Sequence, residues 1–288
     1  FFGITTHTGD LTITNVAGQV LAASVLSGIG GATTGTATVA NNVHITGTVS
    51  AINAAFAADA TKVVFAGNAN TVTLQDNGTV AGNAAVAVYN LADGAGNVFT
   101  TNAVGQTVTG GTQIDNITGS TGSDVIIGGG GNDILTGGTG VDVLTGGTGA
   151  DKFVFGSSDS ANTSYSDYNM SSTFNNGDKF IGDFDIIRDF VTGTDEVDLD
   201  ASITFFTNTD SAYYVNSGNK LEAMGDSLAE RLALLIRGEF DEAADDFTIN
   251  FNSGADTLVY FRASGGVSQG VILEDEILLS SNAANDFI

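Results

Sequence analysis

The sequence predicts a mainly β fold, in which a parallel β-solenoid is flanked by a β-rich N-terminal domain and by a β-rich C-terminal cap carrying one helix. Three observations lead to this prediction. A nine-residue pattern repeats without a slip over residues 110–154, alternating runs of Thr, Ala and Val fill much of the first 109 residues, and the 288-residue chain has 39 glycines but no proline. Short strands between glycine-rich turns are typical of solenoids and related β folds.

The charge of the chain excludes several classes of protein. With 33 acidic and 8 basic side chains, the formal net charge is −25, whereas binding to nucleic acids rests on Lys and Arg. The lack of cysteine excludes disulfides and zinc thiolate sites. The longest apolar run near the C-terminus, Leu232–Ile236, is far shorter than the roughly 20 residues that cross a bilayer. We therefore expect a protein that does not span a membrane.

Residues 1–109 form the predicted N-terminal domain, and only four of the 33 acidic residues lie in it. Its alternating runs predict short strands separated by Gly and Asn turns, which is compatible either with a β-sandwich or with an irregular β-solenoid. A short helix is expected over Ser50–Ala58. The predicted strands include Leu11–Thr14, Thr36–Val39, Lys62–Phe65, Thr71–Leu74 and Ala85–Tyr89.

Residues 110–156 form the second predicted domain, which contains the repeat. In steps of nine from Gly110 the units read GGTQIDNIT, GSTGSDVII, GGGGNDILT, GGTGVDVLT and GGTGADKFV. An aspartate occupies the sixth position of every unit and a large apolar residue the eighth. The aspartates are Asp115, Asp124, Asp133, Asp142 and Asp151, and the apolar residues are Ile117, Ile126, Leu135, Leu144 and Phe153.

Each unit is expected to form a six-residue glycine turn and a three-residue strand whose middle side chain points inward. Two units then make one coil. The odd-numbered units stack Asp115, Asp133 and Asp151 along one edge (the odd row), and the even-numbered units stack Asp124 and Asp142 along the other (the even row). Carboxylates in coils about 4.8 Å apart repel one another, so we expect a cation between the coils.

The ligands available to this cation are all hard oxygens, namely Asp carboxylates and turn carbonyls, which suit Ca²⁺ better than Mg²⁺. We expect the carbonyls of the first and third positions of each unit to join the aspartates. The expected metal ligands are Gly110, Thr112, Asp115, Gly119, Thr121, Asp124, Gly128, Gly130, Asp133, Gly137, Thr139, Asp142, Gly146, Thr148 and Asp151.

The pattern resembles the RTX (repeats-in-toxin) nonapeptide, also called the hemolysin-type repeat, GGxGxDx followed by a large apolar residue. The resemblance covers residues 110–154 and implies a calcium-filled parallel β-roll. Two residues depart from it: Gln113 replaces the fourth-position glycine of the first unit, and Ser120 the second-position glycine of the second. The first coil is therefore expected to bind weakly or to serve as a cap. A flexible linker has no reason to keep aspartates at the sixth position and apolar residues at the eighth position of every unit.

Residues 157–288 form the third predicted domain, a cap that carries a secretion signal. Its acidic stretch, with Asp178, Asp183, Asp185 and the run 187–199, is similar to the segment that closes the roll in RTX proteins of the secreted metalloprotease type, and its acids are candidate calcium ligands. The S-x-x-E spacing of Ser227 and Glu230 predicts a helix over 226–240. Strands are expected over Phe247–Phe251, Thr257–Phe261 and Val271–Leu273.

The last residues, Asn285–Ile288, resemble the uncleaved signal of type I secretion substrates, and the composition of residues 1–109 is similar to that of bacterial surface-layer (S-layer) proteins. The chain starts at Phe1, so we expect a processed or fragmentary C-terminal portion. These resemblances imply an extracellular protein at the cell surface, exported by the type I secretion machinery and self-associating into a surface lattice.

No catalytic site can be identified in the sequence. Only His7 and His44 are present, and neither H-E-x-x-H nor G-x-S-x-G occurs. We therefore expect a structural calcium-binding protein, surface-layer or adhesin-like, rather than an enzyme. The alternative is the secretion and folding module of an RTX enzyme or toxin whose catalytic domain lies upstream of Phe1.

Overall fold

The structure is a computed structural model of the 288-residue chain. It describes residues 9–15, 17–59, 63–94, 96–156, 159, 161–162, 179–199, 214–215, 233–244, 246–250, 253–262 and 268–276. The predicted secretion signal at Asn285–Ile288, together with Asp178 and His7, lies outside the described residues.

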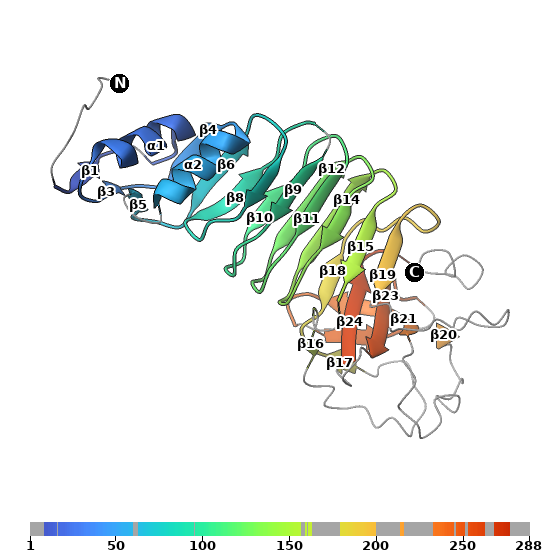
Figure 1. The fold of residues 1–288 in the computed structure, drawn as a ribbon. Helices are drawn as coiled ribbons and strands as arrows, with labels where there is room; N and C mark the ends of the chain where they lie inside the picture. The colour runs from blue at the N-terminus through green and yellow to red at the C-terminus, as the bar shows by residue number, and fades with distance from the viewer. Residues whose placement is uncertain are drawn as a thin grey trace.

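Two parallel sheets face each other along a solenoid that takes up most of the length of the molecule in Figure 1. Successive strands alternate between the sheets, so each coil contributes one strand to each. One sheet contains β2 (Gln19–Ala22), β4 (Val43–Gly47), β6 (Asn70–Leu74), β8 (Val86–Asn90), β10 (Thr107–Thr109), β12 (Val125–Gly130), β14 (Val143–Thr148) and β18 (Asp185–Ile187). The other contains β7 (Thr79–Ala81), β9 (Asn97–Thr100), β11 (Asp115–Thr118), β13 (Ile134–Thr136), β15 (Lys152–Phe155) and β19 (Glu196–Leu199).

The first coils belong to the same solenoid. A short parallel sheet of β1 (Leu11–Ile13), β3 (Ala37–Val39) and β5 (Val63–Phe65) alternates along the chain with β2, β4 and β6. The helices α1 (Ala23–Ala32) and α2 (Val49–Asp59) lie against each other beside these strands (Figure 1). Parallel pairing throughout is the pattern of a solenoid, since a sandwich is built from antiparallel hairpins. The expected helix over Ser50–Ala58 corresponds to α2; α1 was not expected.

The register of the strands aligns the repeat as its period requires. Ile117 pairs with Leu135, and Ile126 with Leu144, each 18 residues further along the chain. All five apolar residues at the eighth position are fully buried in one continuous core. The predicted mainly β fold with a parallel roll is confirmed.

The C-terminal region extends the first sheet and changes its pairing from parallel to antiparallel. Strand β24 (Ser268–Leu273) runs parallel to β18 on one side and antiparallel to its next neighbour on the other. The strands that follow it are β23 (Asp256–Arg262), β21 (Ala233–Asp241), β22 (Asp246–Ile249) and β17 (Lys179–Ile181), with β16 (Ala161–Asn162) and β20 (Tyr214–Val215) pairing alongside. These strands agree with the three predicted near residues 247, 257 and 271.

The helix predicted over 226–240 is wrong for residues 233–240, which form β21; residues 226–232 lie outside the described part. Strand pairing on both sides explains the error, because β21 hydrogen-bonds to β22 and β23. Leu235 packs into the solenoid core, whereas its neighbour Ile236 packs into a second cluster on the opposite face. This alternation belongs to a strand.

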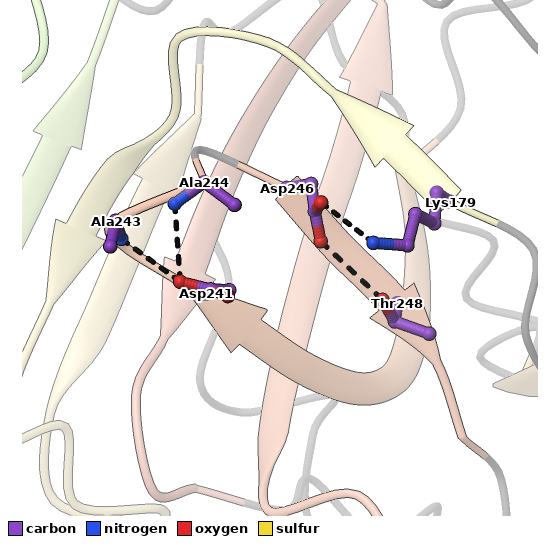
Figure 2. Close-up of polar contacts among 6 residues, drawn as sticks. All are labelled: Lys179, Asp241, Ala243, Ala244, Asp246 and Thr248. Atoms are coloured by element: carbon purple, nitrogen blue, oxygen red, sulfur yellow. Dashed lines mark hydrogen bonds and ion pairs between the residues drawn. The ribbon is translucent and has the colours of Figure 1, made fainter.

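Polar contacts fix the turn and the edge of this C-terminal sheet (Figure 2). The carboxylate of Asp241 accepts hydrogen bonds from the backbone N–H groups of Ala243 and Ala244 at 3.0 and 3.1 Å, and Lys179 pairs with Asp246 at 2.7 Å. Neither of the two helices among the described residues has the length and apolarity needed to span a bilayer.

Candidate metal centre

The turns of the repeat depend on glycine at two positions. In the last three units the second and fourth positions have positive φ, as at Gly129 (105°) and Gly131 (112°). Residues with a β carbon rarely adopt this conformation. The same holds at Gly138, Gly140, Gly147 and Gly149. The two departures of the first coil, Gln113 and Ser120, fall on these positions.

The aspartates of each row are linked by hydrogen bonds from one coil to the next. The backbone N–H of Asp115 donates to Oδ1 of Asp133 at 2.7 Å, and that of Asp133 donates to Oδ1 of Asp151 at 2.8 Å. In the even row the N–H of Asp124 donates to Oδ1 of Asp142 at 2.7 Å. The sequence-predicted odd and even rows are therefore present, with one oxygen of each carboxylate satisfied by the main chain.

The second carboxylate oxygen distinguishes the last three units from the first two. Oδ2 of Asp133, of Asp142 and of Asp151 is buried without a hydrogen-bond partner. By contrast, Oδ2 of Asp115 accepts the N–H of Gly111 at 2.8 Å, and Oδ2 of Asp124 accepts the hydroxyl of Thr101 at 2.8 Å. A buried, unpartnered carboxylate oxygen is strongly unfavourable, so the last three units need a further partner that the first two already have.

Carbonyl oxygens of the first positions face the same spaces. A β carbon added to Gly128 would lie 2.4 Å from Oδ2 of Asp133 and 2.7 Å from the carbonyl oxygen of Gly146. On the other edge, a β carbon at Gly119 would lie 1.7 Å from the carbonyl oxygen of Gly137 and 2.9 Å from Oδ2 of Asp124. Each of these spaces beside a first-position glycine, here called a cradle, thus brings together an aspartate and a first-position carbonyl from the next coil.

The remaining first-position glycines line equivalent cradles. Added β carbons at Gly137 and Gly146 would approach Oδ2 of Asp142 and Asp151, and one at Gly110 would meet the carbonyl of Gly128. The structure therefore brings together the predicted first-position and sixth-position residues of the repeat.

The third-position residues take part in contacts between coils. The carbonyl of Thr148 accepts the N–H of Gly131 at 2.9 Å, and the N–H of Thr139 donates to the carbonyl of Ser120 at 2.8 Å. Gly130 stacks between Thr112 and Thr148, and the hydroxyl of Thr121 lies 3.5 Å from the carbonyl of Ala103. One lone pair of the Thr148 carbonyl is therefore already used; for the other third positions, ligation stays a prediction.

Burial perturbs the aspartates of the later coils. Desolvation raises the pKa of Asp142 from 3.8 to about 7 and that of Asp133 to about 6, and repulsion from neighbouring aspartates adds to both shifts. Desolvation also raises the pKa values of Asp124 and Asp151. A nearby cation would reverse these shifts, because it favours the ionised carboxylate.

Acids of the cap continue both rows. Oδ1 of Asp185 accepts the N–H of Asp142, and Oδ1 of Asp195 accepts the N–H of Asp151, both at 2.9 Å. The carboxylate of Asp189 accepts the N–H groups of Gly146 and Gly147 at 2.8 and 2.7 Å. Of the other predicted cap acids, Asp183 is exposed and Asp198 forms an ion pair with Lys152.

Two residues that sequence reasoning missed precede the aspartates in the two rows. Asn97 pairs in register with Asp115. Thr107 pairs with Val125, so Gln106, the residue before it, aligns with Asp124. A signal for them existed, since the nine-residue phase continues upstream as ADGAGNVFT (92–100) and TNAVGQTVT (101–109). Phe99 and Val108 hold the apolar eighth position of these units and are buried.

The donor set fits calcium. No three His, Cys, Asp or Glu side chains gather around one point within the described ranges, so an ion held here must take many of its ligands from main-chain carbonyls. Calcium accepts six to eight oxygen ligands, carbonyls included, in flexible geometry. The unpartnered Oδ2 atoms supply the negative charge, and the first-position carbonyls supply neutral oxygens.

Comparison with known families identifies this part of the chain. The family model of the RTX calcium-binding nonapeptide repeat (4 copies) matches residues 109–144 and 128–159. Residues 109–159 are therefore a run of RTX repeats, and the ion that this class of repeat binds is Ca²⁺. RTX repeat proteins are typically secreted. No curated protein matches the chain.

Proposed function

We propose that this chain is a structural module of a secreted protein of the bacterial cell surface, surface-layer or adhesin-like, which calcium orders after type I export. Its role is mechanical rather than enzymatic: a rigid rod assembled from parallel coils. In this proposal, self-association of such rods builds a lattice at the cell surface.

The observation that carries the proposal is the continuity of the solenoid across residue 110. Strands β8, β10 and β12 pair in sequence, and so do β7, β9 and β11. The residues upstream of the repeat therefore lengthen the same rod, whereas an enzyme module would favour a separate compact fold with a pocket.

The chemistry of the side chains supports a structural role. His44 lies half-buried on β4, and its Nε2 is 2.8 Å from the hydroxyl of Thr73, a contact between neighbouring strands. The buried carboxylates of the two rows bond to backbone N–H groups of adjacent coils. Such groups hold coils together and are not directed at a substrate.

Calcium dependence gives this rod a switch suited to export. Without the ion, buried carboxylates in successive coils repel one another and oppose folding. Extracellular calcium modules commonly bind with dissociation constants of about 10⁻⁴ to 10⁻³ M. An ion that binds only the folded state stabilises it by mass action, so the rod orders where calcium is abundant.

Electron microscopy of the purified chain tests the lattice proposal. With millimolar calcium we expect regular two-dimensional sheets, and we expect EGTA to disperse them. Asp133→Ala should weaken both calcium binding and sheet formation, because Asp133 lies between Asp115 and Asp151 in its row. Asp159→Ala should affect them less, because Asp159 holds no position in the repeat and accepts the N–H of Gly156, although its charge acts on Asp142. Monodisperse particles under all conditions would overturn the lattice.

The second candidate is the secretion and folding module of an RTX enzyme or toxin, which the match to RTX repeats favours equally. It predicts calcium-dependent folding without sheets. Calcium-dependent refolding and activity of an enzyme fused upstream of this chain, with no lattice in calcium, would favour this candidate over the first.

A further inference from the structure

We propose that the side-chain amides of Asn97 and Gln106 take the place of calcium ions in the coil that precedes the aspartates, and so set the N-terminal limit of the metal sites. This inference rests on the proposed calcium binding of the aspartate rows and deepens it. The coil of residues 92–109 is then a metal-free end of the RTX roll, on which the calcium-dependent coils are built.

Three oxygen atoms converge on the amide nitrogen of Asn97. Nδ2 lies 2.7 Å from Oδ1 of Asp115, 2.9 Å from the carbonyl oxygen of Ala92 and 3.2 Å from that of Gly94. Asn97 is buried, and its Oδ1 has no hydrogen-bond partner. These three acceptors determine the orientation of the amide. Its nitrogen, a hydrogen-bond donor, lies where three oxygen atoms converge.

These carbonyls correspond to the expected calcium ligands. Within the unit 92–100, Asn97 holds the sixth position, so Ala92 is the first position and Gly94 the third. The amide nitrogen thus binds the same two carbonyl positions that we assign to the ion in the aspartate units, together with a carboxylate oxygen of the next coil.

Gln106 holds the corresponding position of the even row, but its side-chain amide uses other partners. Its backbone N–H donates to Oδ1 of Asp124 at 2.7 Å, and its Nε2 donates to the carbonyls of Asn83 and Val86 at 3.0 and 2.6 Å. Its Oε1 accepts the N–H of Asn102 at 2.6 Å. Because the longer side chain reaches into the preceding coil, it fills the hydrogen-bonding positions there without a separate ion.

The replacement of carboxylate by amide removes the negative charge that a cation would otherwise balance in this coil. An amide carries donors for the turn carbonyls and no charge to repel the next carboxylate, whereas a carboxylate accepts only. The amide of Asn97 and the backbone N–H of Gly111 satisfy both oxygens of Asp115. The unpartnered Oδ2 atoms begin at Asp133, two coils beyond the amides and one coil beyond Asp115 and Asp124.

The variant Asn97→Asp tests the proposal in the full chain. It places a carboxylate against Oδ1 of Asp115 and removes the donors, so residues 92–100 should lose at least about tenfold protection from hydrogen exchange in EGTA. Calcium should restore the protection, and equilibrium dialysis should detect one more calcium ion per chain than in wild type. Asn116→Asp is the matched control, because it adds the same charge at an exposed position one residue after Asp115.

Asp133→Asn provides the converse test. It should bind one calcium ion fewer than wild type and gain protection of its own coil in EGTA. If Asn97→Asp does not fold, Gln106→Glu repeats the first experiment on the even row.

The outcomes separate this inference from the calcium function. Wild-type protein that binds no calcium overturns both. Wild type that binds calcium, with an Asn97→Asp variant that gains no ion or whose protection calcium does not restore, overturns the role of the amide alone.

Discussion

The coils upstream of residue 91 and the coils of the repeat share one pattern of strand pairing but are stabilised differently. Upstream, helices α1 and α2 contribute Leu26 and Ile52 to the core, and Tyr89 packs on Phe99 with ring centroids 4.6 Å apart. Each repeat unit buries one large apolar side chain, at its eighth position, whereas other apolar residues of the repeat, such as Ile114, Val125 and Ile134, are exposed. The same architecture therefore has a thick core at one end and a thin one at the other.

Asn70 and the aspartates of the later coils show the same difference among buried polar groups. Asn70, fully buried at the start of β6, accepts the N–H of Val43 at 2.8 Å and donates to the carbonyls of Gly67 and Ala85. Every part of this amide is satisfied by the protein itself. The aspartates of the later coils are satisfied at one oxygen only. Where apolar contacts are few, the parallel coils thus rely on an external ion, and this makes folding conditional on calcium.

Removal of calcium should have the largest effect and should divide the rod in two. We expect EGTA to abolish protection from hydrogen exchange over residues 128–156, because their carboxylates then repel without compensation. Residues 70–91 should keep their protection. Uniform loss over both regions, or protection unchanged in both, would contradict the comparison.

Truncation of a buried apolar side chain at the eighth position of a unit should have the next largest effect on stability. Leu135→Ala removes the one large apolar side chain buried by its unit and should lower the free energy of unfolding in calcium by about 2–5 kcal/mol. Ile134→Ala is the matched control, since Ile134 is 38% exposed on the same strand, and should cost less than about 1 kcal/mol. Chemical denaturation of both variants measures the difference; equal losses would count against a core one residue wide.

The pH dependence should be smaller and should change sign with calcium. The pKa values of Asp133 and Asp142 lie near 6 and 7 in the folded state, above the ordinary 3.8. The folded chain therefore binds more protons than the unfolded chain between about pH 4 and 7, and metal-free stability should fall as the pH rises through that window. Thermal unfolding in EGTA at pH 5 and pH 8 should detect a lower midpoint at pH 8.

With calcium present the trend should reverse, because the ion binds the ionised carboxylates. The matched variant Asp142→Asn should flatten the EGTA profile. A metal-free midpoint that rises from pH 5 to pH 8 would show that other groups dominate the titration.

The sequence predicts the repeat in detail because its period determines geometry. Once the nine-residue spacing is given, the burial of Ile117 and Leu135 and the alignment of Asp115 with Asp133 follow from two units per coil. The deviations at Gln113 and Ser120 also mark the coil in which the carboxylates already have protein donors. Spacing alone carries this information, because each coil contacts only its neighbours.

Other parts depend on contacts that the local sequence does not encode. The run of residues 233–236 is compatible with helix or strand, and pairing with β22 and β23 decides for the strand. Asp185 joins the row of Asp142 from 43 residues away, a distance that no repeat predicts. A pattern defined by aspartate at the sixth position does not include Asn97 and Gln106. The nine-residue spacing continues through them, but with an amide in place of the carboxylate.

The cap acids have a consequence for how such a chain can change in length. Asp185 completes the edge that holds Asp142, and Asp195 completes the opposite edge that holds Asp151. Adding or deleting eighteen residues keeps each edge matched to its own terminating acid. Nine residues would exchange the two edges and leave both ends mismatched, so rods of this design can be lengthened or shortened by whole turns only.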